Sequence, residues 1–201
     1  MLKNHKKNNL SDPDHELMER ICSGELAAFT QLVKKYQRIV MATIYRYTGN
    51  RNEVEDLAQE IFFKVYRAAK SYTPQAKFST WLYRVVVNHC LNYRRSQKRS
   101  ALTTSLDHSM PEKEKSPLQA AQPQYQHPES LIQQQELQAT IQRAIGELPD
   151  RQRMAIILSR FEGLSYKEIA QVLECSLSAV ESLLFRAMTS LKEKLKTQIL
   201  Q

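Results

Sequence analysis

The stretch from Phe78 to Arg99 combines aromatic and basic side chains in a pattern that suits contact with unpaired nucleic acid. Three rings, Phe78, Trp81 and Tyr83, are followed by a group of cations: Arg84, Arg94, Arg95, Lys98 and Arg99. Bases stack on aromatic rings while lysine and arginine follow the phosphate backbone. The sequence alone also allows the rings to be core residues and the cations to be a solvated face.

Residues Tyr166 to Phe185 have the pattern of a helix-turn-helix. Apolar residues at three- and four-residue spacing would bury one face of each helix: Ile169, Ala170, Leu173, Val180 and Leu183. Because the second helix of this motif lies in the major groove of DNA, its outward residues are candidates for reading bases. These residues are Ser176, Leu177, Ser178, Glu181, Ser182 and Phe185.

The starts of both helices in this motif are marked by possible capping boxes. Ser165 with Glu168, and Ser178 with Glu181, have the required spacing. Glu174 occupies a place where the tight turn often has glycine. The charge of Glu181 would be unfavourable near phosphates unless it caps the helix or accepts a hydrogen bond from a cytosine amino group.

The charge of the chain is unevenly distributed. The formal net charge is +8, and residues 1–100 contain 18 Lys and Arg against 9 Asp and Glu. Residues 101–130 contain 2 against 4, and residues 131–201 contain 9 against 8. A cationic excess in one half indicates a polyanionic partner, which could be nucleic acid or an acidic membrane surface.

The composition argues against several classes of protein. The three cysteines form no CxxC pair or Cys/His ligand set, so we expect neither disulfides nor a metal site. No Ser/His/Asp, Cys/His or paired-carboxylate arrangement has credible spacing, and we expect no catalytic residues, cofactor or small-molecule substrate. No apolar run approaches the roughly 20 residues that span a bilayer. We therefore expect a cytoplasmic protein that is neither an enzyme nor an integral membrane protein.

Helical periodicity dominates the chain and predicts an all-α fold of two small helical domains, the C-terminal one containing the helix-turn-helix. The expected helices cover about residues 13–22, 25–49, 52–71, 79–99, 130–147 and 150–161, followed by the motif. Residues 100–129 are rich in Pro, Ser and Gln without apolar periodicity, which is typical of a flexible linker. The predicted parts are a disordered tail (1–13), a first domain (14–99), the linker (100–129) and a second domain (130–196).

The third expected helix has one apolar and one polar face. Its buried stripe is predicted to contain Val54, Leu57, Ala58, Ile61, Val65 and Ala69. The opposite face contains Asp56, Gln59, Glu60 and Phe63. The aromatic ring of Phe63 either contacts a partner or widens the core stripe, and periodicity allows both.

Four motifs, taken together, resemble the bacterial RNA polymerase sigma factors, and more narrowly their extracytoplasmic-function (ECF) group. They are DLAQEIFFKVYRA (56–68), FSTWLYRVVVN (78–88), ELPDRQRMAIIL (147–158) and EGLSYKEIAQVL (162–173). Members of that group have a promoter-melting and a promoter-upstream domain joined by a tether. The resemblance implies a subunit that binds core polymerase, recognises the −35 and −10 promoter elements and assists DNA melting.

The resemblance also implies roles for residues. Asp56, Gln59, Glu60 and Phe63 match the surface that docks on the clamp of the largest polymerase subunit, and the second domain would contact the flap. The −10 and melting residues would be Phe78, Thr80, Trp81, Arg84, Asn88, Asn92, Arg94 and Arg95. The helix-turn-helix, with Arg186 added to its outward residues, would read the −35 element. An anti-sigma factor is a further expected partner.

The predicted recognition helix departs from the family pattern at one stretch. The recognition helix has Ala179 to Leu183 where the family often has Thr-Val-Lys-Ser-Arg, so phosphate contacts and −35 specificity do not carry over.

A stand-alone dimeric repressor or activator would explain the helix-turn-helix but not the cluster between Phe78 and Arg99. An enzyme acting on nucleic acid would need acid–base or metal-binding residues that the sequence does not offer.

Overall fold

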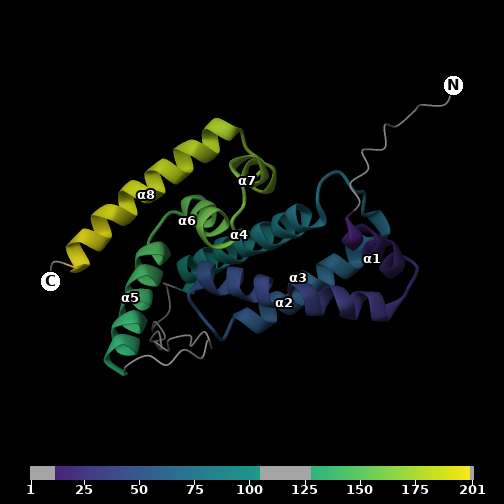
Figure 1. The fold of residues 1–201 in the computed structure, drawn as a ribbon, viewed down its shortest axis with the longest axis horizontal. Coiled ribbons are helices and arrows are strands. Elements are labelled where there is room, and N and C mark those ends of the chain that lie inside the picture. The colour runs from purple at the N-terminus through teal and green to yellow at the C-terminus, as the bar shows by residue number, and fades with distance from the viewer. Residues whose placement is uncertain (1–11, 105–127, 200–201) are drawn as a thin grey trace.

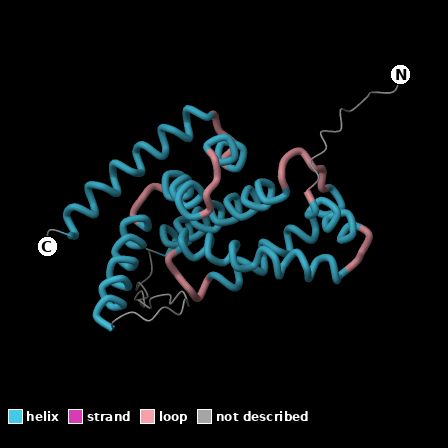
Figure 2. The backbone as a smooth tube through the Cα atoms, in the orientation of Figure 1, coloured by secondary structure: helices cyan, strands magenta, loops and turns pink. Residues whose placement is uncertain are grey.

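The computed structural model describes residues 12–104 and 128–199. These residues form helices joined by short loops, with no strand among them (Figure 2). The expected tail (1–13) and linker (100–129) lie largely outside the described residues. The predicted all-α class with a C-terminal helix-turn-helix is confirmed.

The first domain contains α1 (Pro13–Cys22), α2 (Leu26–Thr48), α3 (Val54–Ala68), the 3₁₀ turn η1 (Ala69–Ser71) and α4 (Phe78–Thr104). Helix α4 extends past residue 99, where the sequence predicted the linker to begin, because no proline or glycine stops it before Thr104. Helices α1, α3 and α4 all pack on α2 (Figure 1). The predicted buried stripe of α3 is confirmed, with Phe62 added to it.

The second domain contains α5 (Pro128–Gly146), α6 (Asp150–Ile156), η2 (Ile157–Phe161), α7 (Tyr166–Val172) and α8 (Leu177–Ile199). The single helix expected over 150–161 changes at Ile157 into a wider π-helical turn. There the N–H of Glu162 donates to the carbonyl of Ile157, five residues earlier, at 3.2 Å. Such turns often occur at functional positions, and this one leads directly into Glu162.

The two domains pack against each other. Helix α4 lies beside α7, and the end of α2 lies against α5 and η2 (Figure 1). Buried side chains of both domains, such as Ile44 and Phe78 in the first and Ile157 and Ile169 in the second, belong to one continuous apolar cluster. The chain therefore folds back on itself so that the helix-turn-helix faces α4.

Helix ends in the first domain follow local signals in the sequence. Asp12 caps α1, and Pro13 occupies its first turn, as predicted. Gly49 ends α2 in the left-handed conformation (φ 72°), and its N–H donates to the carbonyl of Tyr45 at 2.8 Å. Among the described residues, no helix is both long enough and apolar enough to cross a bilayer.

Asp12 also caps a second helix far away in the chain. Its carboxylate accepts hydrogen bonds from the backbone N–H of Asp14 (3.1 Å) and from that of Phe78, the first residue of α4 (2.8 Å). Burial opposes ionisation, but these N–H groups outweigh it and lower the pKa of the Asp12 carboxyl. One side chain thus links α1 to the start of α4.

We expect Asp12→Ala to lower the free energy of unfolding by about 2 kcal/mol, because it removes two helix caps of roughly 1 kcal/mol each. Because the pKa of Asp12 is lowered in the folded state, the full loss of unfolding free energy is expected at neutral pH. The difference between Asp12→Ala and the wild type should shrink as the pH falls below about 4 and Asp12 becomes protonated. Urea unfolding measures it. Glu19→Ala, at an exposed site on α1, is the control, and equal stability of the two variants would contradict the double cap.

Candidate nucleic-acid interface

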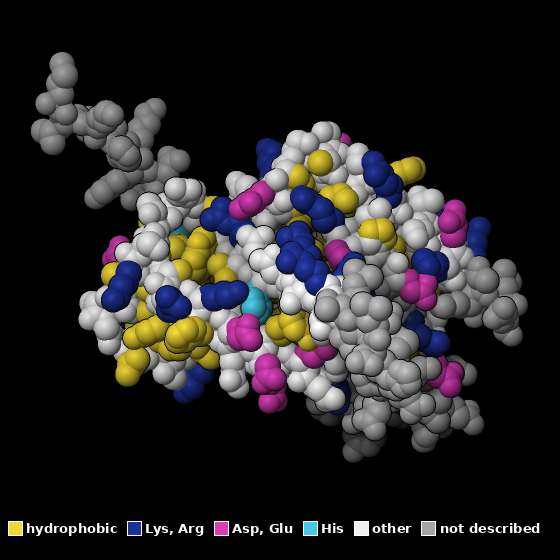
Figure 3. Space-filling model, turned by 180° about the vertical axis from the view of Figure 1, so that it is seen from behind, with side chains coloured by type: hydrophobic (Ala, Val, Ile, Leu, Met, Phe, Trp, Pro, Cys, Tyr) yellow, Lys and Arg dark blue, Asp and Glu magenta, His cyan; other side chains and the backbone are white. Residues whose placement is uncertain are grey.

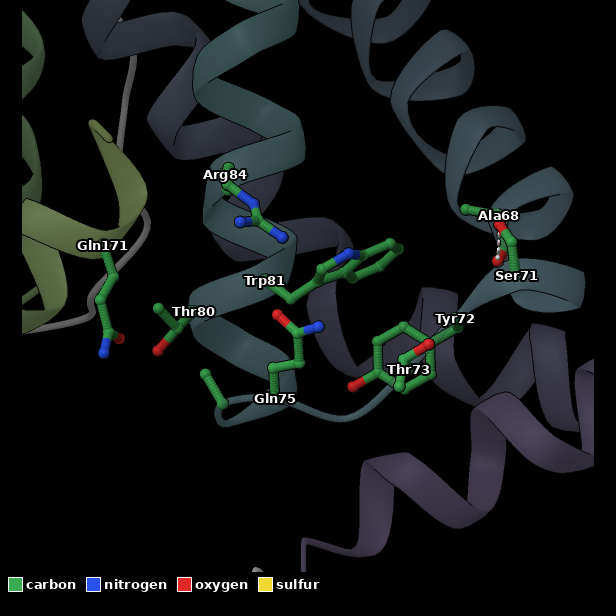
Figure 4. Close-up of a pocket in the computed structure, with 10 residues that line it drawn as sticks. Ala68, Ser71, Tyr72, Thr73, Gln75, Thr80, Trp81, Arg84 and Gln171 are labelled. Carbon is green, nitrogen blue, oxygen red and sulfur yellow. Dashed lines mark hydrogen bonds between the residues drawn. The ribbon is translucent and has the colours of Figure 1, made fainter. Parts of the chain in front are cut away.

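A pocket of about 390 Å³ opens beside the start of α4 (Figure 4). Trp81 and Arg84 project into it from α4, and Tyr72 and Gln75 come from the loop before that helix. Gln171, on α7 of the second domain, lies on the opposite side. An aromatic floor with a cation above it offers a base a surface for stacking and a phosphate a counter-charge.

The aromatic side chains around the pocket differ in their access to it. Phe78 is fully buried, with ring centroids 5.3 Å from Tyr36 and 5.5 Å from Trp81. Its ring therefore packs under Trp81 and presents no surface to a base in this conformation. Trp81 is half-buried and meets Tyr72 edge-on at 5.0 Å. Of the alternatives open from sequence, the structure favours the core for Phe78 and the pocket for Trp81.

Tyr72 is held in place from the first helix. Its hydroxyl lies 2.7 Å from Nδ1 of His15 on α1. Burial, reinforced by the charges of Asp12 and Asp14, raises the pKa of Tyr72 to about 12, so the hydroxyl is protonated at neutral pH. Helix α1 thus supports the pocket through Tyr72 and through the cap on α4.

The other predicted −10 residues divide between two stripes of α4. Asn88, Asn92 and Arg95 are exposed. Thr80 is buried, and two arginines form long ion pairs with the second domain, Arg84 to Glu174 at 3.9 Å and Arg94 to Asp150 at 3.8 Å. The structure therefore leaves one stripe open to solvent and turns the neighbouring stripe toward the second domain.

The polar face of α3 is open to solvent. Asp56, Gln59 and Glu60 are exposed, and 60% of Phe63 is exposed. The ring of Phe63 is therefore not part of the buried stripe. Of the two roles that periodicity allowed, contact with a partner is the one that fits this exposure. The guanidinium of Arg67 lies 5.8 Å from its ring, and an exposed ring of this kind beside charged residues suits a protein partner.

The helix-turn-helix has the predicted first capping box but not the second. The hydroxyl of Ser165 accepts from the N–H of Glu168, whose carboxylate accepts from the N–H of Ser165. Helix α8 begins at Leu177, and the hydroxyl of Ser176 accepts from the N–H of Ala179. The prediction that Ser178 and Glu181 form a box is wrong, because the helix starts before Ser178.

The predicted −35 residues all lie on the exposed surface of the turn and of α8. They are Ser176, Leu177, Ser178, Glu181, Ser182, Phe185 and Arg186. Phe185 is 73% exposed. With Met188 and Leu195 it borders a shallow apolar groove along α8, which suits contact with a partner as well as with DNA.

Sequence reasoning missed the polar residues that join the two domains. The side chain of Glu162 is 6% exposed. It accepts hydrogen bonds from Thr43 (3.0 Å) and Arg46 (3.0 Å) on α2 and from the hydroxyl of Tyr83 on α4 (2.8 Å). The guanidinium of Arg46 also lies 4.8 Å from the ring of Phe161. No local pattern predicts this site, because its donors lie 79 to 119 residues from Glu162.

A second set of interdomain contacts caps the end of α2. Gln142 on α5 donates to the carbonyl of Arg46 at 2.9 Å, and buried Arg153 on α6 donates to that of Tyr47 at 2.8 Å. The last carbonyls of a helix have no partner within it. Here the other domain supplies the donors, and Arg153 also bonds the carbonyls of Gly146 and Leu148 in its own domain.

One face of the molecule is rich in cations. Figure 3 shows Lys and Arg side chains gathered at its centre, and exposed hydrophobic side chains toward the end where α1 lies. Across the part of the chain that the structure describes, no three His, Cys, Asp or Glu side chains come close enough to hold a metal ion. Lysine and arginine side chains gathered on one face favour a polyanionic partner.

Comparison with known proteins decides the family. Residues 32–100 match Sigma-70 region 2, and residues 138–191 match Sigma-70 region 4. The ECF RNA polymerase sigma-E factor of Escherichia coli K12 is 37% identical over 92% of this chain and 96% of its own. The chain belongs to the ECF sigma factors. It therefore acts with RNA polymerase in promoter-directed initiation of transcription.

Two further relatives agree with this assignment. RNA polymerase sigma-H factor of Pseudomonas aeruginosa is 34% identical over 92% of this sigma factor and 95% of its own length. The structure of CnrH in complex with the cytosolic domain of CnrY aligns with a TM-score of 0.64 and 26% identity, covering 92% of this chain and 99% of CnrH.

The turn of the helix-turn-helix holds a strained residue that can be tested. Glu174 has a left-handed backbone (φ 50°), where glycine avoids a steric cost of about 1 kcal/mol. We expect Glu174→Gly to be more stable than Glu174→Ala by about 1 kcal/mol in thermal or urea unfolding. Both variants lose the carboxylate, so their difference isolates the backbone. Equal stability would show that the turn is not strained.

Proposed function

We propose that this sigma factor uses three separate surfaces for its three tasks. The polar face of α3 would bind the clamp of core RNA polymerase, α4 and its pocket would hold and open the −10 element, and the N-terminal part of α8 would read the −35 element. The observation that supports this most strongly is the pocket around Trp81, since a base can stack there beside a cation.

On the polymerase side, Phe63 would be the apolar anchor, with Asp56, Gln59 and Glu60 as polar contacts around it. Interfaces commonly combine a central aromatic side chain with a polar rim. The exposure of all four residues on one helix supports this role. The flap of the polymerase is the expected partner of the second domain.

On the DNA side, the −10 element would be contacted by six residues of α4: Trp81, Arg84, Asn88, Asn92, Arg94 and Arg95. Trp81 and Arg84 line the pocket, which suits an extruded base, whose unstacking costs a few kcal/mol. Thr80 and Phe78 would act from beneath, by shaping the pocket floor.

The protein would act by binding alone, in the cytoplasm, without catalysing a covalent step or using a cofactor. In vitro transcription from genomic fragments, with core polymerase alone or with this protein, tests the proposal. New defined start sites only when the protein is present would support it. DNA binding by the protein alone, without any gain in initiation, would favour a stand-alone regulator instead.

Two substitutions should separate polymerase binding from melting. We expect Phe63→Ala to weaken binding to core polymerase by about 30-fold, the effect of losing an aromatic anchor worth roughly 2 kcal/mol.

Trp81→Ala should leave the affinity for core polymerase unchanged but lower initiation from duplex promoters about tenfold or more, because base stacking is worth about 1–3 kcal/mol. Transcription from a pre-melted promoter should be less affected.

The control for Phe63 is Leu26→Ala, which removes another exposed apolar side chain (65% exposed) from the same domain. It should leave both polymerase affinity and initiation unchanged. If Trp81→Ala lowered initiation equally on duplex and pre-melted templates, Trp81 would have no role in strand opening.

An anti-sigma protein is a further proposed partner. The complex of CnrH with the cytosolic domain of CnrY provides a related example of a partner bound to this fold. Affinity capture of the tagged chain from unstressed cells should recover an inhibitor that blocks the transcription assay when added back. Capture of core polymerase alone would argue against such control.

A further inference from the structure

We propose that this sigma factor closes on itself through a latch centred on Glu162, and that the closed form withholds the −10 surface while leaving the polymerase and −35 surfaces free. The inference rests on the proposed roles of the three surfaces. Its physical core, the docking of the second domain on α2 and α4, is independent of them.

The latch is a buried carboxylate whose hydrogen-bond donors come from the other domain. Thr43, Arg46 and Tyr83 surround Glu162, and burial together with the Glu162 charge raises the pKa of Tyr83, so that its hydroxyl stays protonated and donates. A buried charge is strongly destabilising when its partners are removed. If the domains separate, water solvates the Glu162 carboxylate and its three donors alike, so the contact belongs to the closed form.

Ion pairs along the edge of the interface use DNA-binding cations. Asp150 pairs with Lys98 at 2.7 Å and with Arg94 at 3.8 Å, and Glu174 pairs with Arg84 at 3.9 Å. Carboxylates thus occupy positions beside α4 where phosphates would otherwise be bound. In addition, Gln171 on α7 faces Trp81 across the pocket (Figure 4). Duplex or single-stranded DNA on this stripe of α4 would have to displace α7 and the turn that follows it.

The other two surfaces face away from the closed interface. The α3 face around Phe63 is exposed, and so are the outward residues of α8. The closed chain can therefore bind polymerase and duplex −35 DNA. It cannot offer the −10 strand the whole of the proposed binding surface on α4. Because closure and −10 binding exclude each other, the apparent DNA affinity is reduced by the fraction of molecules that are open.

Two conservative substitutions on opposite sides of the interface should open the latch. Glu162→Gln keeps the shape but removes the charge and replaces one of the two acceptor oxygens by an NH2 group, so the side chain can no longer accept from both Arg46 and Tyr83. Tyr83→Phe removes one donor from the first domain. The matched controls are Glu19→Gln and Tyr66→Phe, which make the same chemical changes at exposed positions outside the interface.

The chain has a built-in probe of opening, because Trp81 is its sole tryptophan and lines the pocket that Gln171 of the second domain faces. We expect acrylamide to quench Trp81 fluorescence about twofold more efficiently in both latch variants than in the wild type and the controls, with small-angle scattering showing a larger radius of gyration. Binding of single-stranded DNA from a promoter mapped by the transcription assay should tighten about tenfold, as expected if few wild-type molecules are open. Circular dichroism checks that helix content is retained.

Unchanged quenching and unchanged dimensions in both variants would overturn the latch, whatever the transcription assay shows. If the variants open but bind the DNA no more tightly than wild type, closure does not withhold the −10 surface, and the proposal fails while the sigma-factor roles stand. Failure of those roles has a different signature, which is the absence of promoter-specific initiation in wild type and latch variants alike.

Discussion

The buried carboxylate of Glu162 ties the second domain to the first. A charge that is almost removed from water needs donors close by, and within this structure they come from α2 and α4 of the first domain. Glu162 itself lies between a π-helical turn and the left-handed Gly163 (φ 67°). Gln142 and Arg153 act at the same seam by satisfying the carbonyls at the end of α2.

Helix α4 takes part both in this contact between the domains and in the pocket around Trp81. Its residues at three- and four-residue spacing form adjacent stripes, one presenting Asn88, Asn92 and Arg95 to solvent and the next meeting the second domain through Tyr83, Arg94 and Lys98. The proposed DNA contacts and the domain contacts are therefore neighbours on one helix. The second domain, docked on the second stripe, lies next to the first and pairs with Arg84, so the proposed closure would limit the access of DNA to part of α4.

The pocket is built from parts that are distant in the sequence. Asp12 caps α4, His15 holds Tyr72, and Phe78 supports Trp81 from beneath. Fixing an aromatic ring in advance lowers the entropy that binding must overcome. The short helix α1 thus has a purpose beyond packing, because it orients the surface that a base would meet.

The sequence by itself determined the elements, since helix signals act within one or two turns: the Asp12–Pro13 start, the Gly49 end, the Ser165 capping box and the stripe of α3 are local. The order and spacing of four motifs also identified the family. Tertiary structure decided what depends on contacts between distant residues, including the burial of Phe78, the exposure of Phe63 and the partners of Glu162. The start of α8 at Leu177 is marked by a local cap, since the hydroxyl of Ser176 accepts from the N–H of Ala179, and the sequence alone had placed that cap at Ser178. A carboxylate in a sequence reveals its charge but not the donors that surround it, because those depend on how the two domains meet.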